Sequence, residues 1–450
     1  MQARILKSIA AFAAALAILL GASPMAPELA AQTGQAGTQQ QAGAQTQPQA
    51  QTTPQQPVFR AEIERVRVDV QVVNSSKGDP VIGLGLDDFE VWLDGRPRRV
   101  TSAELVTFEN DPLPSDVGAT TVRTPGRVPE DARVYVVAID QMGLPVAAIT
   151  PMKETIRRFL LQLRPQDMVA LYEFPYRTPK LDISHDHTQV ARALDRIMGM
   201  RTQQPGSYNL SASEIVDIAA NDSDTLNSVL ARECGVINAD LTGDIGCPEN
   251  VRAEARGLAA YLEVESSQRL NELVKLSQTL AYIPGRKTIV LMSGGLITSS
   301  KAGGRPDIRS MLTSVGDDIA NAQTNLYVIH LDSSMTDAYG AATRGTRISN
   351  TGLTTRTVDR FQTLTQDRST LITGLEILAG RAGGAMFSVD AGTPASVFDR
   401  VLLETRAYYV LGVEPADEDR DGKSHYIRVK TTAKHADVRS RVQVFIPQKK

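Results

Sequence analysis

Three side chains that carry oxygen ligands, Asp140, Ser293 and Asp332, each follow an apolar run of the sequence. Runs of this kind are typical of parallel strands that are covered on both faces. The carboxyl ends of such strands form the edge at which doubly wound sheets bind ligands. We therefore expect these side chains to share a crevice. The chemistry that this placement indicates is the binding of a ligand by carboxylate and hydroxyl groups at the sheet edge.

Two other clusters match metal sites only in part. Asp417, Asp419 and Asp421, followed by glycine, match the first half of an EF-hand loop, but its twelfth position is Arg428 in place of glutamate. An arginine there repels a cation, so a solvated turn between two strands is favoured over a calcium site. In His185–His187 the two imidazoles would point to opposite sides of an extended chain, which favours a surface loop over a metal site.

The sequence contains no complete catalytic motif. Gly-x-Ser-x-Gly, His-Glu-x-x-His and the full phosphate-binding Gly-x-x-x-x-Gly-Lys-Ser/Thr pattern are all absent. The five histidines are scattered, and His330 lies within an apolar run, where a hydrogen-bonded core residue is expected. We predict no catalytic residue and no cofactor, although folding could assemble a site that no local motif reveals.

The two cysteines, Cys234 and Cys247, are thirteen positions apart. In an exported chain they are candidates for a disulfide that stabilises a local loop by ~3 kcal/mol at most. The alternative is two separate thiols. Two cysteines without nearby histidines cannot form a structural zinc site.

The first 57 residues are predicted to lie outside the folded body. Residues 1–31 resemble a secretory signal peptide, with basic Arg4 and Lys7 before the apolar run Ile9–Leu20. A buried N-terminal helix is the alternative. Residues 32–57 are uncharged and rich in Gln, Thr and Pro, which is typical of a disordered linker. No other stretch reaches about 18 apolar residues, so we expect no membrane span in the mature chain.

The elements that position the crevice are predicted to form two domains. Strands with alternating apolar residues are expected within 58–110 and again within 406–450, at about 66–72, 89–93, 100–108, 408–413, 426–432 and 438–445. Either set alone has too few strands to hide an apolar face, so we predict that both sets share one small β-sandwich.

Between them, after a proline-marked linker at 111–130, residues 131–405 alternate between strand and helix patterns. Repeated βα units predict an α/β fold with a doubly wound, mostly parallel sheet and a helical insertion near 205–262. Thr150-Pro151 is expected to begin the first helix. The expected strands are 134–139, 168–174, 288–292 and 326–331, and the expected helices are 150–163, 190–198, 206–232, 249–282, 368–380 and 394–404.

Composition narrows the functional classes. Hydrophobic residues make up 42% and charged residues 22% of the 450 residues, which are ordinary values for a globular protein. The net charge of −3 gives no basic excess, so a general nucleic-acid footprint is excluded.

Several motifs, in this order, resemble the bacterial secreted VWFA-related domain family, which is built around a von Willebrand factor A-like domain. The resemblance covers about 58–450. The motifs that carry it are Val81–Leu84, Asp88–Val91 with Asp94-Gly95, Arg164–Ala170, Pro284–Thr288 with Leu291–Gly295, Gly383-Gly384 and Tyr408–Gly412.

The resemblance implies a metal-ion-dependent adhesion site, but this sequence departs from it. The family pattern Asp-x-Ser-x-Ser is present only as Asp140, with Met142 and Leu144 at the serine positions. Ser293 stands where a second aspartate is expected. A thioether and an isobutyl group cannot coordinate a hard cation. We therefore predict a degenerate crevice at Asp140, Ser293 and Asp332 that holds no metal.

The functional prediction is a secreted, periplasmic or cell-envelope interaction or adhesion module that binds a protein or cell-surface partner. The long segment 333–366, which carries Arg344, Arg347, Arg356 and Arg360, is expected either to contact an acidic partner or to be a solvated loop. Two alternatives remain open, namely an extracytoplasmic hydrolase with its site in the crevice and a structural envelope component. The sequence leaves the oligomeric state open.

Overall fold

A computed structural model describes nine segments of the chain: 65–108, 132–174, 182–201, 206–234, 246–337, 348–349, 352–353, 363–390 and 395–448. Contacts divide the chain into Met1–Ala61 and Glu62–Lys450, and all described residues belong to the second unit. The predicted signal peptide, the 32–57 tract, the linker at 111–130 and the four arginines of 333–366 lie outside the described residues. No described helix is both long enough and apolar enough to cross a membrane.

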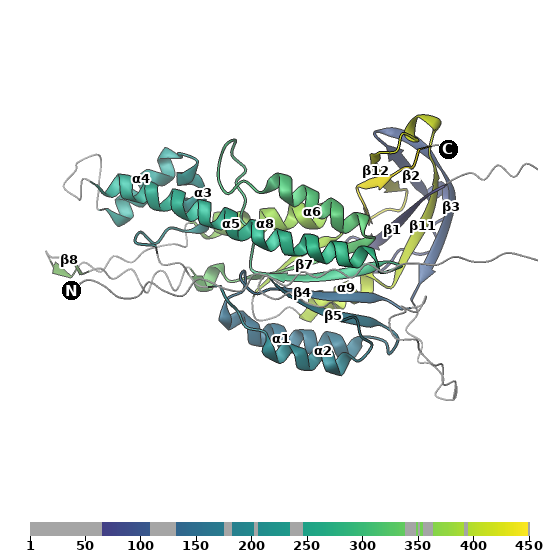
Figure 1. Cartoon of the computed structure of the whole chain (residues 1–450), viewed down its shortest axis with the longest axis horizontal. Helices are drawn as coiled ribbons and strands as arrows, with labels where there is room; N and C mark the ends of the chain where they lie inside the picture. Colours follow the sequence, from purple (N-terminus) through teal and green to yellow (C-terminus); the bar gives the residue numbers. More distant parts are fainter. Residues whose placement is uncertain are drawn as a thin grey trace, which may run out of the picture. The chain divides into compact units, whose positions relative to one another are not determined.

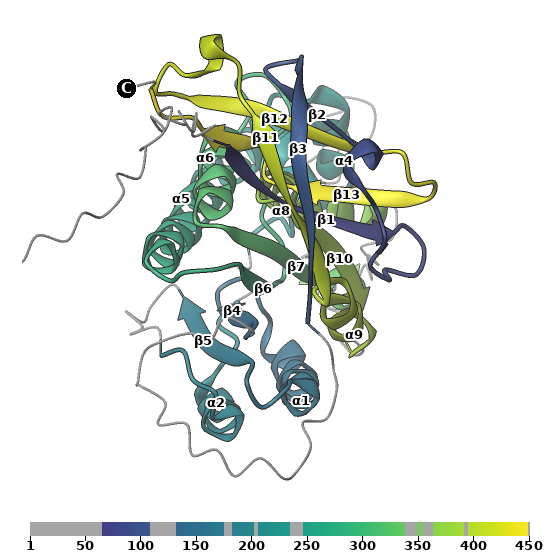
Figure 2. The same cartoon turned by 90° about the vertical axis from the view of Figure 1, so that its right-hand side faces the viewer.

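The central element is a five-stranded parallel sheet with the strand order β10-β7-β6-β4-β5. Figure 1 shows this sheet between layers of helices, and Figure 2 labels its strands. Every paired strand runs parallel to its neighbour. The first strand of this sheet along the chain, β4, therefore lies between the second, β5, and the third, β6, so the winding reverses between β4 and β6. The α/β fold with a parallel sheet, predicted from the sequence, is confirmed. Its strands are β4 (Val134–Asp140), β5 (Met168–Phe174), β6 (Lys287–Ser293), β7 (Thr324–Asp332) and β10 (Ala385–Asp390).

Helices cover both faces of this sheet because its strands are apolar on both sides. One face packs against α1 (Val146–Gln162), α2 (His187–Ala193) and α9 (Ala395–Glu404). The other packs against α5 (Cys247–Ala281), α6 (Arg309–Asn321) and α8 (Leu364–Arg381). The remaining helical elements are α3 (Ala212–Ala219), α4 (Ser223–Glu233), η1 (Leu86–Asp88), η2 (Leu194–Arg196) and η3 (Asp417–Asp419).

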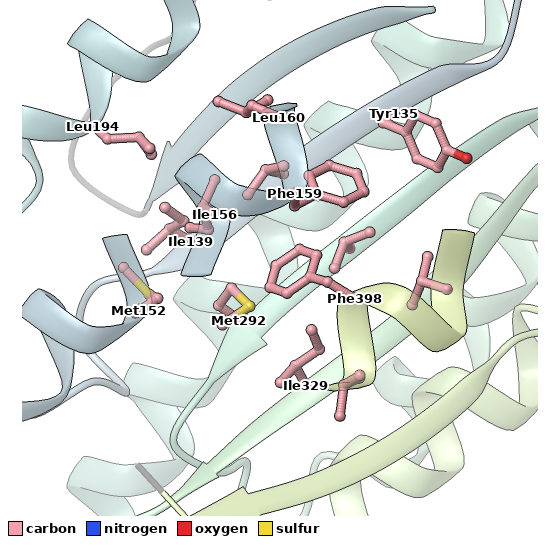
Figure 3. Close-up of a cluster of buried hydrophobic side chains, with 14 of the residues drawn as sticks. Tyr135, Ile139, Met152, Ile156, Phe159, Leu160, Leu194, Met292, Ile329 and Phe398 are labelled. Carbon is pink, nitrogen blue, oxygen red and sulfur yellow. The ribbon is translucent and has the colours of Figure 1, made fainter. Parts of the chain in front are cut away.

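Aromatic side chains lie among aliphatic ones in the core on the α1 side (Figure 3). Phe159 of α1 lies between Tyr135 of β4 and Phe398 of α9, with ring centroids 5.4 Å and 4.9 Å away. All three side chains are almost fully buried. Truncating such a phenylalanine to alanine costs about 3–5 kcal/mol. This contact fixes α1 and α9 on the sheet.

The N-terminal and C-terminal strands form one curled antiparallel sheet with the order β13-β1-β11-β3-β2-β12-β14 (Figure 2). The predicted sharing of strands between the two ends of the chain is thus present, but as one continuous sheet in place of a two-layer sandwich. The curl brings its own apolar residues together around Val68, Val70, Leu93 and Leu411. The strands are β1 (Val66–Asn74), β2 (Phe89–Leu93), β3 (Arg96–Thr107), β11 (Ala407–Glu414), β12 (Ser424–Thr431), β13 (Ala436–Ser440) and β14 (Gln443–Phe445), and a separate pair is β8 (Ile348–Ser349) with β9 (Gly352–Leu353).

A buried polar cluster joins the curled sheet to the amino end of the parallel sheet. The side-chain amide of Gln71 on β1 donates to the carbonyl of Glu404 (2.6 Å) and accepts from the amide of Asn325 (3.0 Å). The carboxylate of Glu404 is fully buried and pairs with Arg400 (2.6 Å) and Arg439. Because these groups come from both sheets, their hydrogen bonds tie the two sheets together.

Two differences between predicted and observed helices have a local explanation. The predicted start at Thr150-Pro151 is wrong, since α1 begins at Val146 and Pro151 lies inside it. The predicted helix 206–232 is broken at Asn221, which has a φ of 65°. The break is stabilised by Asp222, whose side chain accepts from the amide of Thr225 and so caps α4. The left-handed backbone at Asn221 and the cap at Asp222 therefore divide this segment into α3 and α4.

Candidate functional site

Asp140 and Ser293 meet where the winding of the parallel sheet reverses. Asp140 ends β4 and Ser293 ends β6, and these strands are neighbours. The hydroxyl of Ser293 donates to Asp140 Oδ2 (2.7 Å), and both residues are buried. This is the position at which open α/β sheets bind ligands. The structure therefore brings together two of the three crevice residues named from the sequence.

The third, Asp332, lies at the end of β7 but has different partners. It forms an ion pair with Arg368 of α8 (2.6 Å) and accepts hydrogen bonds from Ser334. Two positions earlier on β7, His330 is buried and its Nδ1 lies 3.0 Å from the hydroxyl of Ser388. Burial lowers the pKa of His330, so a neutral core imidazole is expected near pH 7.

The principal partner of Asp140 is Arg269 of α5, which the sequence reasoning missed. Its Nη2 contacts Asp140 Oδ2, Ser293 Oγ (3.1 Å) and the carbonyl oxygen of Gly295 (2.5 Å). Arg269 is only 7% exposed. It is 129 positions from Asp140, and an arginine within a long amphipathic helix has no local signal that distinguishes it from a surface residue. Only the folded packing of α5 on the sheet reveals the pairing.

Two glycines allow this close packing. A Cβ on Gly143 would lie 2.3 Å from Asp140 Oδ2 and 2.8 Å from the Arg269 guanidinium. A Cβ on Gly294 would lie 1.9 Å from the carbonyl oxygen of Gly143. Gly143 also donates its amide to Asp140 Oδ1 (3.0 Å). The backbone at the sheet edge is therefore shaped to hold the guanidinium against the carboxylate.

The donor set at this edge does not fit a divalent cation. The oxygens that would face it, from Asp140, Ser293 and Gly295, surround one guanidinium nitrogen of Arg269. A buried positive group at that point opposes a second cation by direct repulsion. No group of three or more His, Cys, Asp or Glu side chains within the described segments is arranged to hold a metal. The guanidinium of Arg269 thus occupies the position at which a metal ion would have to bind.

A cavity of about 240 Å³ opens beside Arg269, between the sheet edge, α5 and the start of α3. Its walls are mixed, with apolar side chains from several elements and a few charged ones. The residues that line it are Met142, Gly143, Met200, Arg201, Gly206, Asn209, Leu210, Ser211, Ala212, Ile215, Leu258, Tyr261, Leu262, Glu265, Ser266, Arg269, Gly294, Gly295, Ile297, Ser334, Asp337, Asp367 and Leu371.

Glu265 is the carboxyl group of this cavity with the most altered environment. Burial raises its pKa above the usual glutamate value; nearby Arg269 opposes this shift and Asp140 adds to it. Within the described residues, the cation closest to it is Nη1 of Arg269, which lies 3.6 Å from Glu265 Oε1, beyond hydrogen-bonding distance. The cavity therefore contains a carboxyl group that is only partly compensated.

Two exposed apolar side chains line the cavity, and two exposed methionines lie close to lining residues in sequence. Met200 and Tyr261 line it and are 43% and 41% exposed. Met198, two positions before Met200, is also exposed, and its backbone amide donates to the side-chain oxygen of Gln141 (3.4 Å), the residue after Asp140. Met335 follows Ser334, which lines the cavity, and is also exposed. Adaptable methionine side chains of this kind are common on protein-binding surfaces.

The other clusters named from the sequence have internal partners. Asp419 forms an ion pair with Arg98 (2.5 Å), and Asp421 lies 3.0 Å from Nε2 of His425. Asp186 caps α2 by accepting from the amide of Gln189 (3.1 Å), and Nε2 of His187 lies 2.9 Å from the carbonyl oxygen of Asp167. These groups therefore stabilise turns and helix ends.

Cys234 and Cys247 form a disulfide in the structure. It joins the end of α4 to the beginning of α5, where Cys247 is buried in a small apolar cluster with Val229 and Val251. The bond thus ties α4 to α5, the helix whose later residues line the cavity.

No family model and no curated protein matches the chain. Among solved structures, it is similar to the VWA domain of SpRpn10, with 10% sequence identity and a TM-score of 0.25. That match covers 60% of this chain and 93% of the other. At these values the likeness carries no information about the partner or the activity of this chain.

Proposed function

We propose that the chain is an exported, non-catalytic binding module that recognises a protein or cell-surface partner without a metal ion. The observation that carries this proposal is the contact of Arg269 with Asp140 and Ser293 at the ligand-binding edge of the sheet. At this edge the positive charge comes from the buried Arg269 side chain and not from a bound metal ion. Binding at this edge should therefore resist chelators.

Two features support a protein partner and export. Met200 and Tyr261 are exposed and line the cavity next to charged groups, and such a mixture of apolar and charged side chains is common in protein interfaces. The disulfide between Cys234 and Cys247 fits an oxidising compartment, in which such bonds persist. The signal-like N-terminus predicted from the sequence is consistent with the same location.

The test is capture of a partner from an extract of the cell envelope, with the full chain as bait. We expect a specific partner that is retained in EDTA and lost with Met200→Glu, which places a charge on the cavity rim. The matched control is Tyr282→Glu, because Tyr282 is 89% exposed and follows α5 at its other end, before β6 begins. Release of the partner by EDTA, or equal loss with both variants, would count against recognition at the Arg269 edge.

A further inference from the structure

Helix α5 presents a regular stripe to the cavity. Leu258, Leu262, Glu265 and Arg269 follow one another at spacings of four, three and four residues, so they lie on one face of the helix. Ile297 and Leu371, which lie outside α5, add apolar surface to the lining. A ligand that lies along this stripe meets two leucines before it meets a carboxyl group.

The charged side chains around the cavity differ in how closely they are paired with groups of opposite charge. Both arginines of the lining have close partners. The guanidinium of Arg201 donates to Ser333 (2.6 Å) and to Asp337 (2.6 Å). That of Arg269 is held by Asp140, Ser293 and the carbonyl of Gly295.

The carboxylates of the lining differ from one another in their hydrogen-bond partners. Asp367 accepts from the amide and hydroxyl of Ser213, at 2.8 Å and 2.6 Å. Within the described segments, Glu265 lacks a cation at hydrogen-bonding distance; its neighbours are the Tyr261 hydroxyl and Arg269 at 3.6 Å. The lining includes three carboxyl groups and two guanidinium groups, so the uncompensated charge is negative.

We propose that this cavity binds the side chain of a lysine or arginine from the partner, with its cation at the Glu265 carboxylate and its methylene groups along Leu258 and Leu262. The inference rests on the proposed function and names the group that the partner supplies. Basic side chains bury their alkyl stems against apolar surface while their charged ends reach a polar group. A water needs only ~10–15 Å³, so a cavity of about 240 Å³ has room for a side chain and adjacent backbone.

Binding of a cation here should be linked to protonation of Glu265. Burial raises the pKa of this carboxyl group in the free protein, and a cation beside it would favour the ionised form. The other titratable or charged groups around the cavity are Arg269 and Tyr261 on α5, Arg201, Asp337, Asp367 and Asp140. The affinity for a basic side chain should therefore fall as the pH is lowered through the pKa of Glu265.

The experiment titrates the full chain, labelled with ¹³C in the methionine methyl groups, with four blocked pentapeptides of the form Gly-Ala-X-Ala-Gly. X is lysine, arginine, norleucine or glutamate. Met142 and Met200 line the cavity, so their methyl signals report its occupancy. The lysine and arginine peptides should shift these signals and bind about tenfold more tightly than the uncharged norleucine peptide, because a charge-assisted hydrogen bond is lost in the latter. The glutamate peptide should not bind.

The matched variants are Glu265→Gln and Glu249→Gln on the same helix. Glu249 is exposed, lies in the first turn of α5 and is not part of the cavity lining. Glu265→Gln should remove the lysine preference and its pH dependence, whereas Glu249→Gln should change neither. Equal affinity for lysine and norleucine, tighter binding of glutamate, or no shift with any peptide would overturn the inference. None of these results depends on partner capture, so the proposed function can fail or succeed separately.

Discussion

The two ends of the parallel sheet solve the same problem, the burial of charge, in different ways. At the amino end, Glu404 is enclosed by Arg400 and Arg439, and Gln71 links the cluster to both sheets. The cavities there are only about 20 Å³ each. At the carboxyl end, Arg269 pairs with Asp140 beside a cavity of about 240 Å³. One end is sealed by a second sheet, and the other remains open to a ligand.

The buried charges at the two ends of the sheet therefore serve different purposes, one structural and the other functional. Buried ion pairs cost free energy to desolvate, and they are seldom the most stable way to fill a core. At the amino end the pairs join two sheets whose strands come from opposite ends of the chain. At the carboxyl end the pair joins one helix to the sheet edge and leaves a carboxyl group, Glu265, only partly compensated. We infer that the first arrangement holds the fold together and that the second prepares a binding site.

The strongest test of the sealed end is truncation after Thr405. In the full chain β1 is hydrogen-bonded to β11 and β13, and both would be removed. Only the β2–β3 pair would keep a strand partner, and an isolated hairpin is marginally stable at best. Limited proteolysis should therefore cut residues 66–107 rapidly, whereas the five strands of the parallel sheet remain protected for longer. Equal resistance of 66–107 in both chains would show that the C-terminal strands do not support it.

A smaller but measurable effect is expected from breaking the pair at the open end. Arg269→Met leaves Asp140 buried without its cation, and Asp140→Asn leaves the guanidinium without its anion. Each should lower the free energy of unfolding by about 3–5 kcal/mol, because an uncompensated buried charge is costly. The double variant should lose less than the sum of the two, since it removes both charges. Urea unfolding of the four proteins measures this coupling.

Glu404→Gln serves as the comparison for these variants, because it removes a buried charge at the sealed end. It should destabilise the protein while leaving the methionine signals of Met142 and Met200 responsive to the lysine peptide. Arg269→Met should alter that response. Additive losses in the Arg269–Asp140 cycle, within about 0.5 kcal/mol, would indicate that the two residues do not act as a pair.

The sequence predicted the sheet better than it predicted the site. Apolar runs such as Val134–Ile139 are short, continuous and bounded by turn residues, so local pattern was enough to place four of the five parallel strands. The fifth, β10, was not among the strands expected from local pattern. The alternation of Val66, Val68 and Val70 likewise predicted a strand with one buried face, and the shortage of strands at each end predicted their pairing. The single curled layer was not foreseen, because alternation indicates a buried face without revealing what covers it.

The candidate site depends on contacts that no local pattern records. Asp140 and Ser293 were named because each ends a strand, and strand order then placed them together. Arg269 and Glu265 lie in the middle of a 35-residue helix whose polar residues all resemble surface positions in sequence. Their role depends on which face of α5 meets the sheet edge, and this is decided by tertiary packing of distant residues.

The smallest effect expected concerns the curled sheet and its pH dependence. His425 lies between two carboxylates, with Nδ1 2.7 Å from Asp94 and Nε2 3.0 Å from Asp421. Burial lowers the pKa of His425, but the hydrogen bonds to Asp94 and Asp421 outweigh it, so the folded-state pKa lies above the usual value. A group with a raised folded-state pKa stabilises the fold below its unfolded pKa of about 6.5, and this contribution is lost as the pH rises through the folded-state value. The effect should be small because both carboxylates are partly exposed and water screens them. Urea midpoints measured from pH 5.5 to 8.5 should therefore fall more steeply for the wild-type chain than for His425→Asn, which cannot be protonated. Parallel curves for the two proteins would show that the imidazole is not held as a cation by these carboxylates.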